Sequence, residues 1–393
     1  MNTLITIAVI YTLFAFARDF YRIISGFFYK PLRVSHRAPR FYRPLVSVII
    51  PAWNEEVGIV RTINSVIKND YWNVEIIVVD DGSTDGTVHS VETMIQKYPT
   101  IKLVSQKNGG KAAALNTGIH RSKGSLIMTL DADSFLERTS LTKMVGALSD
   151  ARYGVAIGEV VVGNTETWLG RAQHYEYTVG FHIKRSQHVF DSAYIFPGAL
   201  TLFRRSVLEK IGDFTNYSST EDLDISMRIK MAGYRIAYID SALCITEGAS
   251  TLRGLLNQRT RWRHGFLECL MYQKEFLFSG KKGTYLTWID LPLQIFGLIE
   301  ILFFPFIVGI LGYFTITGSS SLTLLGAYLL LPFTLVLLSD LRAYSGAKRW
   351  VLVAPVLIFL IAWVEHIALL KSIYRTLRRK HTTWTVWQRT GQW

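Results

Sequence analysis

Residues 127–133 read IMTLDAD, an apolar run that ends in two aspartates one residue apart, Asp131 and Asp133. The run predicts a buried strand, in which alternate side chains point to the same side. Two carboxylates on one side repel each other unless a cation lies between them, and Mg²⁺ or Mn²⁺ takes such oxygen ligands together with substrate phosphates. The alternative is a turn in which one of these aspartates caps a following helix, SFLERTSLTKMVGAL.

Three further apolar segments come before this stretch: PLVSVIIPA (44–52), EIIVV (75–79) and KLVS (102–105). Each predicts a strand, and the helical patterns between them favour a parallel sheet with right-handed crossovers. Three of these four strands end in polar loops that contain acids, WNEE, DDGSTDGT and DADS. Because the carboxyl ends of parallel strands meet at one edge of a sheet, the loops predict a ligand site at that edge.

The second loop supplies Asp80 and Asp81, whose carboxylates can accept hydrogen bonds from a uracil N–H or a ribose hydroxyl. The alternative is an Asp-Gly turn in which Asp85 caps the next helix. The segment NGGKAAALNTGI (108–119) is a Gly-Gly turn that leads into a helix, where free N–H groups and Lys111 suit a phosphate. The spacing is not that of a P-loop, and a solvated lysine is the alternative.

Two later stretches carry further polar residues. The segment FPGA, with Gly198 at its third position, leads into a strand-like run, TLFRRS (201–206). Glu221 and Asp222 then open a helix, LDISMRIKMAGY. A carboxylate near a helix N-terminus is stabilised by the helix dipole, so Asp222 is either a plain helix cap or a catalytic group.

The chain has 393 residues and a net charge of +13. Many basic residues directly follow the first and the last apolar segments, which is the pattern of the cytoplasmic side of a membrane. We therefore expect membrane lipids as partners and no nucleic acid. Cys244 and Cys269 are too few for a disulfide framework and indicate inert buried thiols.

Apolar stretches at both ends predict a membrane protein with a soluble α/β domain at 44–250. Residues 1–25 indicate an uncleaved N-terminal anchor, because the basic residues follow the apolar run. In the C-terminal region 286–372, the stretches 288–314, 320–339 and 350–370 are each long enough for a span.

Four spans would leave the basic tail, residues 373–393, outside the cell, which conflicts with the charge rule. Either the stretch 350–370 bends back at Pro355 or rests in the interface, or the stretch 288–314 does so at Pro292 and Pro305. The charge rule favours a cytoplasmic tail.

Residues 251–280 are amphipathic and predict helices that lie in the membrane interface. Four ionisable residues, Asp290, Glu300, Glu365 and His366, lie within or at the ends of the apolar stretches. Such groups are costly in lipid, so they either line a polymer channel or form ion pairs.

Taken together, the chain resembles the membrane-embedded, inverting glycosyltransferases of family 2. The resemblance covers residues 46–262 and rests on seven motifs in the family's order: VSVIIPAWNEE, VVDDGSTDGT, GGKAAALNTG, LDADS, PGALTLFRRS, STEDLDISMRI and QRTRW. The Q-x-x-R-W form is typical of processive polysaccharide synthases (cellulose, chitin, hyaluronan and poly-N-acetylglucosamine). QHYEY (173–177) and the closing WTVWQRTGQW are most similar to bacterial poly-β-1,6-N-acetylglucosamine synthases.

The resemblance implies a Rossmann-like, mostly parallel GT-A domain with α-helical membrane segments, and a UDP-sugar donor. Asp80 and Asp81 would hold the uridine, with Asp81 as the closer contact. Lys111 would approach the uridine or the diphosphate. Asp131 and Asp133 would hold Mg²⁺ or Mn²⁺ and the diphosphate.

On the acceptor side, the resemblance makes Asp222 the general base, with Glu221 beside it as a second catalytic residue. Gly198 and Trp262 would contact the acceptor sugar. The diphosphate and the acceptor end would be held by three residues of the QRTRW motif: Gln258, Arg261 and Trp262. For Trp262 the alternative is an aromatic residue of the membrane interface.

Three functions are compatible with these features. The first is a synthase in the plasma membrane that extends a β-linked polymer from UDP-N-acetylglucosamine, or from glucose or hyaluronan-type donors, and passes it outward. The second is transfer of one sugar to a lipid. The third, a transporter with a nucleotide-sensing domain, has no use for Asp222 or the Asp-Ala-Asp pair. Because four spans make a thin channel, oligomers or a small membrane partner could complete one.

Overall fold

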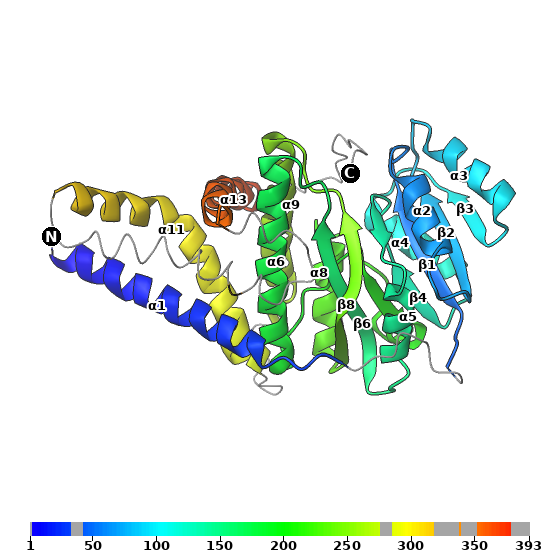
Figure 1. Ribbon diagram of the computed structural model, residues 1–393, viewed down its shortest axis with the longest axis horizontal. Helices are drawn as coiled ribbons and strands as arrows, with labels where there is room; N and C mark the ends of the chain where they lie inside the picture. The colour runs from blue at the N-terminus through cyan, green and yellow to red at the C-terminus, as the bar shows by residue number, and fades with distance from the viewer. Residues whose placement is uncertain (1, 33–41, 276–284, 318–337, 339–351, 379–393) are drawn as a thin grey trace.

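The computed structural model describes residues 2–32, 42–275, 285–317, 338 and 352–378. Figure 1 shows an α/β domain at one end and two long helices that project from the other. Two upright helices, α6 (Trp168–Val189) and α9 (Leu252–Tyr272), stand between the two parts. The side chains of Thr167 and Thr251 cap them by accepting hydrogen bonds from backbone N–H groups.

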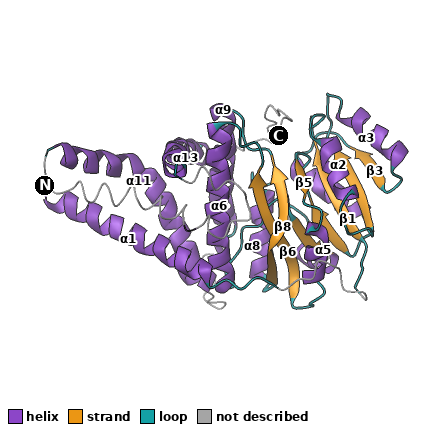
Figure 2. Cartoon of the chain, in the orientation of Figure 1, coloured by secondary structure: helices purple, strands orange, loops and turns teal. Residues whose placement is uncertain are grey.

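The α/β domain is built on one sheet with the strand order β3-β2-β1-β4-β7-β6-β8-β5 (Figure 2). Its strands are β1 (Val46–Ala52), β2 (Val74–Asp80), β3 (Ile101–Ser105), β4 (Leu126–Thr129), β5 (Ser134–Leu136), β6 (Tyr153–Val162), β7 (Thr201–Arg204) and β8 (Arg235–Thr246). Strands β1 to β4 are parallel to one another, as predicted. Strand β6 is parallel to β8, while the β4–β7, β6–β7 and β5–β8 pairings are antiparallel, so the sheet is mixed.

Six helices accompany the sheet in the described part of the domain: α2 (Ile59–Ile67), α3 (Thr87–Lys97), α4 (Lys111–Arg121), α5 (Ser140–Ala147), α7 (Arg205–Ile211) and α8 (Glu221–Met231). Every residue of β1 is buried, as expected for a parallel strand that is covered on both faces. The apolar side chains of β1, β2 and β4 form the centre of the core. This packing fixes the strand ends from which the acidic loops project.

The region after β4 differs from the prediction. Strand β4 ends at Thr129, so Asp131 and Asp133 lie in a turn beyond it and not on the strand itself. The helix expected from residue 134 is wrong, because Ser134–Leu136 is strand β5, which pairs with β8. Helix α5 begins only at Ser140. Local sequence indicated a helix here, and pairing with a strand a hundred residues away overrides it.

The other part of the molecule contains α1 (Asn2–Phe27), the short π-helix η2 (Leu286–Asp290), α11 (Leu291–Ile316) and α13 (Ala354–Leu377). Helices α1 and α11 project together from the body, whereas α13 is seen along its own axis and so runs across them (Figure 1). Within the described residues, two helical segments are long and apolar enough to span a membrane, Leu286–Tyr313 and Val356–Leu377. The predicted span at 320–339 lies outside the described residues apart from residue 338.

Neither α11 nor α13 bends back at a proline. Pro292 and Pro355 lie in the first turns of α11 and α13, where proline needs no hydrogen bond, and Pro305 lies inside α11 without ending it. The suggested reversals at these residues are therefore wrong. The interfacial alternative for α13 stays open, because that helix crosses the direction of α11.

The four ionisable residues noted in the apolar stretches, Asp290, Glu300, Glu365 and His366, have polar partners. Arg18 lies 2.6 Å from Glu300, and Arg22 lies 3.5 Å from Asp290. His366 Nδ1 lies 2.9 Å from the carbonyl oxygen of Ile301. The two ion pairs join α1 to η2 and α11. For Asp290 and Glu300 they support the alternative of ion pairing over that of lining a polymer channel.

Candidate active site

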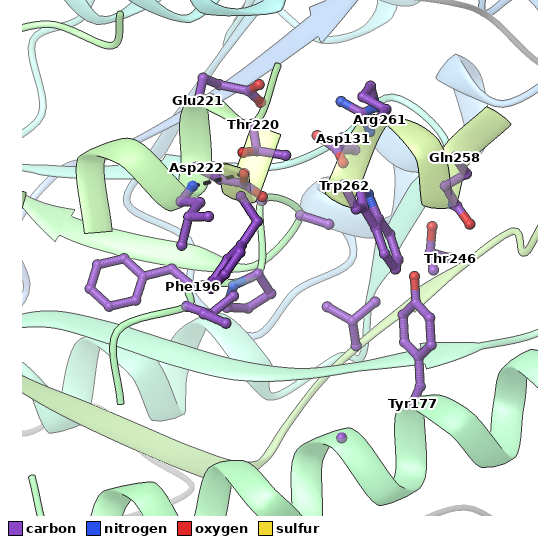
Figure 3. Close-up of a pocket in the computed structure, with 18 of the residues that line it drawn as sticks. Asp131, Tyr177, Phe196, Thr220, Glu221, Asp222, Thr246, Gln258, Arg261 and Trp262 are labelled. Atoms are coloured by element: carbon purple, nitrogen blue, oxygen red, sulfur yellow. Dashed lines mark hydrogen bonds between the residues drawn. The ribbon is translucent and has the colours of Figure 1, made fainter. Parts of the chain in front are cut away.

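A cavity of about 530 Å³ lies at the carboxyl ends of the central strands (Figure 3). It brings together nine of the eleven predicted site residues, from five different segments: Lys111, Asp131, Asp133, Gly198, Glu221, Asp222, Gln258, Arg261 and Trp262. The cavity also reaches Gln294 of α11 and Glu365 of α13. It therefore connects the strand ends with the apolar helices α11 and α13.

Lys111 is an ion-paired residue of the cavity wall and not a solvated lysine. The preceding Gly110 has a φ of 87°, a conformation that favours glycine. The lysine Nζ lies 2.6 Å from Asp131 and 3.3 Å from Glu221. Burial alone would lower the pKa of Lys111, but the charges of Asp131, Glu221 and Asp222 outweigh it and keep the pKa above its ordinary value.

The carboxylate of Asp222 has a raised pKa, which a general base would need. Burial raises its pKa to about 6, the Glu221 charge adds to this rise, and the charges of Lys111 and Arg261 oppose it. Its Oδ1 accepts a hydrogen bond from the backbone N–H of Leu223 at 2.8 Å. A carboxylate with this pKa is ionised at neutral pH yet is a stronger base than an ordinary aspartate.

Gly198 lies against both of these charged groups. A Cβ placed on Gly198 would be 3.0 Å from Asp222 Oδ2 and 3.3 Å from Lys111 Nζ. The absent side chain therefore leaves room for the base and its neighbouring cation. The structure shows no direct role for Gly198 in acceptor binding, which stays a prediction.

Asp131 and Asp133 suit a divalent cation that completes its ligand shell with substrate. No cluster of three or more metal-ligating side chains occurs in the part of the chain that the structure describes. Two carboxylates in the cavity wall match Mg²⁺ or Mn²⁺ sites that rely on one or two acids plus phosphate oxygens. The Asp131 carboxylate is ion-paired with Lys111, whereas Asp133 Oδ1 accepts a hydrogen bond from the hydroxyl of Ser134 at 3.0 Å.

The two remaining predicted residues, Asp80 and Asp81, do not line the cavity. The Asp81 carboxylate is fully buried and accepts hydrogen bonds from Gln106 Nε2 and from the backbone N–H groups of Gly109 and Gly110 at 2.7 to 2.9 Å. It thereby anchors the turn that places Lys111. Contact with a uridine stays a prediction for both aspartates.

Helix α9 carries the QRTRW motif and also holds the loop that precedes Asp222. Glu268 accepts hydrogen bonds from the backbone N–H and the hydroxyl of Ser219 at 2.8 and 2.9 Å. Gly265 packs so closely on Thr220 that a Cβ there would collide with it. Arg261 Nη1 approaches the carbonyl oxygen of Ser219 at 3.5 Å. The loop before Asp222 and the QRTRW helix thus form one packed unit.

Helix α6 contributes cavity residues that were not predicted as site residues, among them Glu176, Tyr177 and Lys184. The ring centroids of Tyr177 and Trp262 are 6.3 Å apart. Burial lowers the pKa of Lys184 to about 8, although the charges of Glu159 and Asp222 oppose it. The QHYEY segment was the available signal for the first two, whereas Lys184 is an ordinary helix lysine in sequence.

Comparisons with known proteins agree with this geometry. A solved mannosyltransferase from Pyrobaculum calidifontis, in complex with GDP-Man and Mn²⁺, superposes with a TM-score of 0.66 at 23% identity, over 96% of this chain and 99% of that one. The mixed sheet, its acidic loops and the cavity define a GT-A-type glycosyltransferase domain.

The family follows from the sequence matches. Residues 47–212 match the family model described as glycosyl transferase family 2. Poly-β-1,6-N-acetyl-D-glucosamine synthase of Staphylococcus aureus (strain COL) is 31% identical over 257 residues, which are 65% of this chain and 62% of the relative. The enzyme of the same name from Staphylococcus epidermidis is 31% identical over 229 residues, covering 58% and 55%. The chain thus spans less than two thirds of the length of these relatives.

Proposed function

We propose that the protein is an inverting, metal-dependent membrane glycosyltransferase that extends a β-linked polysaccharide from UDP-N-acetylglucosamine. The donor and the polymer are suggested by the names of the staphylococcal relatives. The observation that carries the proposal is Asp222, a partly buried carboxylate of the cavity wall with a pKa of about 6. It shares one cavity with two cations, Lys111 and Arg261, and with the indole of Trp262.

In the proposed reaction, Asp222 accepts the proton of the acceptor hydroxyl as that oxygen attacks the anomeric carbon. Attack from the face opposite the leaving group inverts the carbon, so an α-linked donor gives a β-linked product. Arg261 stabilises the charge that grows on the departing diphosphate. Trp262 stacks on the apolar face of the acceptor sugar and orients the attacking hydroxyl.

The charge of the cavity supports a metal requirement. Eight acidic and four basic side chains line it, so a nucleotide diphosphate entering alone would meet net repulsion. A divalent cation held by Asp131 and Asp133 would neutralise the diphosphate and polarise its oxygens. The solved neighbour that contains GDP-Man and Mn²⁺ is consistent with this requirement.

The cavity's extension toward Gln294 and Glu365 suggests that the acceptor lies on the membrane side. This feature also suits the second candidate function, transfer of one sugar to a lipid. We favour the polymer because the matching relatives are named as polymer synthases. A homo-oligomer or a small membrane partner would complete the channel.

For the membrane arrangement, we propose a multi-pass protein of the plasma membrane with a cytoplasmic catalytic domain. Helices α1 and α11 cross the bilayer side by side, and α13, which runs across α11, rests in the interface (Figure 1). If residues 320–339 form the return span, the basic loop at 340–349 and the tail are both cytoplasmic. Cysteine labelling from either side of the membrane, at residues 345 and 385, tests this arrangement.

The deciding experiment uses purified protein in nanodiscs with Mn²⁺ or Mg²⁺. Each common UDP-sugar is added in turn, nucleotide release is measured, and the product is sized on a gel. Release with one donor and a polymer ladder is expected for the synthase. A small glycolipid as the sole product would assign single-sugar transfer, and no release from folded protein, with or without added native membrane extract, would overturn the enzyme proposal.

A further inference from the structure

The second residue of QRTRW, Arg259, is the largest fully buried side chain of the described residues. Its Nη2 lies 2.6 Å from Glu176 of α6, and its Nε lies 2.9 Å from Glu365 of α13. Arg263, one helical turn further on, lies 2.7 Å from the other oxygen of Glu365. Two arginines and two glutamates thus form an electrically balanced cluster that joins three helices.

Arg259 also contacts two residues predicted to bind substrate. Its guanidinium lies 4.1 Å from the ring centroid of Trp262, over the face of the indole. Its Nη1 donates a hydrogen bond to Gln258 Oε1 at 3.0 Å. A planar guanidinium held by two carboxylates is a rigid support for an aromatic ring. The orientation of Trp262 in the cavity wall therefore depends on the cluster.

The support extends to the membrane-side helix α13. Glu365 lies in the middle of α13, and one oxygen faces each of the two arginines of α9. Two turns further along α13, the hydroxyl of Ser372 donates to the carbonyl oxygen of Thr260 at 2.9 Å. Helix α13 is therefore fixed to the QRTRW segment itself and not merely to the domain as a whole.

We propose that Arg259 and Glu365 are positioning residues that set the acceptor side of the cavity by holding Trp262 and Gln258. This inference rests on the proposed function, in which Trp262 meets the acceptor sugar. It makes acceptor use depend on where α13 lies, while the donor side, built by Lys111 and Asp131, does not.

The test compares Glu365→Gln with Glu300→Gln in nanodiscs. Both changes remove the charge of a carboxylate on an apolar helix that is paired with an arginine of another helix, but Glu300 contacts Arg18 on α1, away from α9. Arg259→Lys is the second variant, since it keeps the charge and loses the planar group. Folding is checked by size-exclusion profile and thermal unfolding before any comparison.

Two quantities are measured on folded protein. The first is turnover at saturating donor, which should fall about tenfold in Glu365→Gln with the donor KM within about twofold, as expected for misplaced reacting groups. The second needs no substrate: the emission of Trp262, taken as the difference between each protein and its Trp262→Phe form. Acrylamide should quench this emission more strongly in Glu365→Gln and Arg259→Lys, and equally in wild type and Glu300→Gln.

Unchanged turnover and unchanged quenching in both variants would overturn the inference. Equal losses in Glu365→Gln and Glu300→Gln would also overturn it, because they would reflect general loosening of the helices. If the quenching changes as expected but wild type releases no nucleotide from any donor, the positioning of Trp262 stands and the proposed function fails.

Discussion

Charged side chains serve different purposes in the cavity and in the helices on its membrane side. In the cavity wall, acids outnumber bases eight to four. In the apolar helices, Arg18 pairs with Asp19 and Glu300, and Arg22 pairs with Asp290, so each of these acids has an arginine partner. Buried ions without partners are costly, and such pairing is what a purely architectural role requires.

In the proposed function, the imbalance of the cavity serves the reaction. A surplus of carboxylates would lower the affinity for a diphosphate until a cation arrives, and the Glu221 charge helps to raise the pKa of Asp222. The comparison predicts that changes in the cavity alter chemistry with little loss of stability, whereas changes in the paired helices do the reverse. Four measurements can break or sharpen this contrast.

The largest effect is expected from Asp222→Asn. An asparagine of the same shape cannot accept the acceptor proton, so turnover should fall by about 10²–10⁴-fold. Donor binding and the unfolding temperature should stay close to wild type, because a buried charge is removed and not created. The measurement is nucleotide release at saturating donor.

Asp213→Asn is the matched control for that substitution, since Asp213 lies on the exposed surface beside His120. Its turnover should equal that of wild type. An active Asp222→Asn protein would show that the raised pKa of Asp222 results from burial alone and has no catalytic role. The contrast between the cavity and the ion-paired helices would then fail.

Metal dependence should give the next largest effect. Chelation with EDTA should abolish nucleotide release, and Mn²⁺ or Mg²⁺ should restore it. Asp133→Asn removes one ligand charge, so the metal concentration for half-maximal activity should rise about 10–100-fold, the range for weakened metal sites. Asp70→Asn, which affects a surface ion pair with Arg138, should leave that concentration unchanged. Full activity after exhaustive chelation would show that Asp131, Asp133 and the other acids of the cavity do not act by holding a metal ion.

The strands and loops that carry this chemistry were predictable because their signals are local. Apolar runs followed by acids define β1, β2 and β4, and parallel topology brings their ends together without further information. Strands β5, β6 and β8 were missed because their identity depends on pairing between distant segments. Ser134–Leu136 is the clearest case, since only the partner strand β8 makes it a strand.

The direction in which an acid points was not predictable. Asp81 and Asp131 both follow apolar strands, yet the Asp81 carboxylate turns to the backbone of Gly109 and Gly110 while Asp131 faces the cavity. Arg259 shows the same difficulty in QRTRW. A motif records which residue types recur, but only packing shows that this arginine is buried beneath Trp262.

The pH dependence tests whether Asp222 senses the surrounding charges. Its pKa is raised, so protonation below about pH 6 removes the base, and turnover should fall roughly tenfold per pH unit below that point. Lys111 favours the ionised form, so Lys111→Met should move this acidic limb to higher pH, whatever it does to the maximal rate. Lys102→Met, at the Glu75 pair, should not move it. An acidic limb at the same pH in all three proteins would show that the cavity charges do not tune the base.

The smallest expected effect comes from Gly198→Ala, which adds one methyl group at the closest approach to Asp222 and Lys111. The new carbon would lie 3.0 Å from Asp222 Oδ2, so the carboxylate must shift by a few tenths of an ångström. A displaced base lowers turnover steeply, and we expect about a tenfold loss with the donor KM little changed. Gly146→Ala on α5 is the matched control, because a Cβ there meets nothing within 4 Å and alanine favours a helix. Gly146→Ala should therefore keep full turnover and unfold at the same or a slightly higher temperature. If Gly198→Ala instead lowers the unfolding temperature and leaves turnover unchanged, Gly198 contributes to packing and not to catalysis. The cavity wall at this point would then resemble the ion-paired helices, whose charges stabilise the structure.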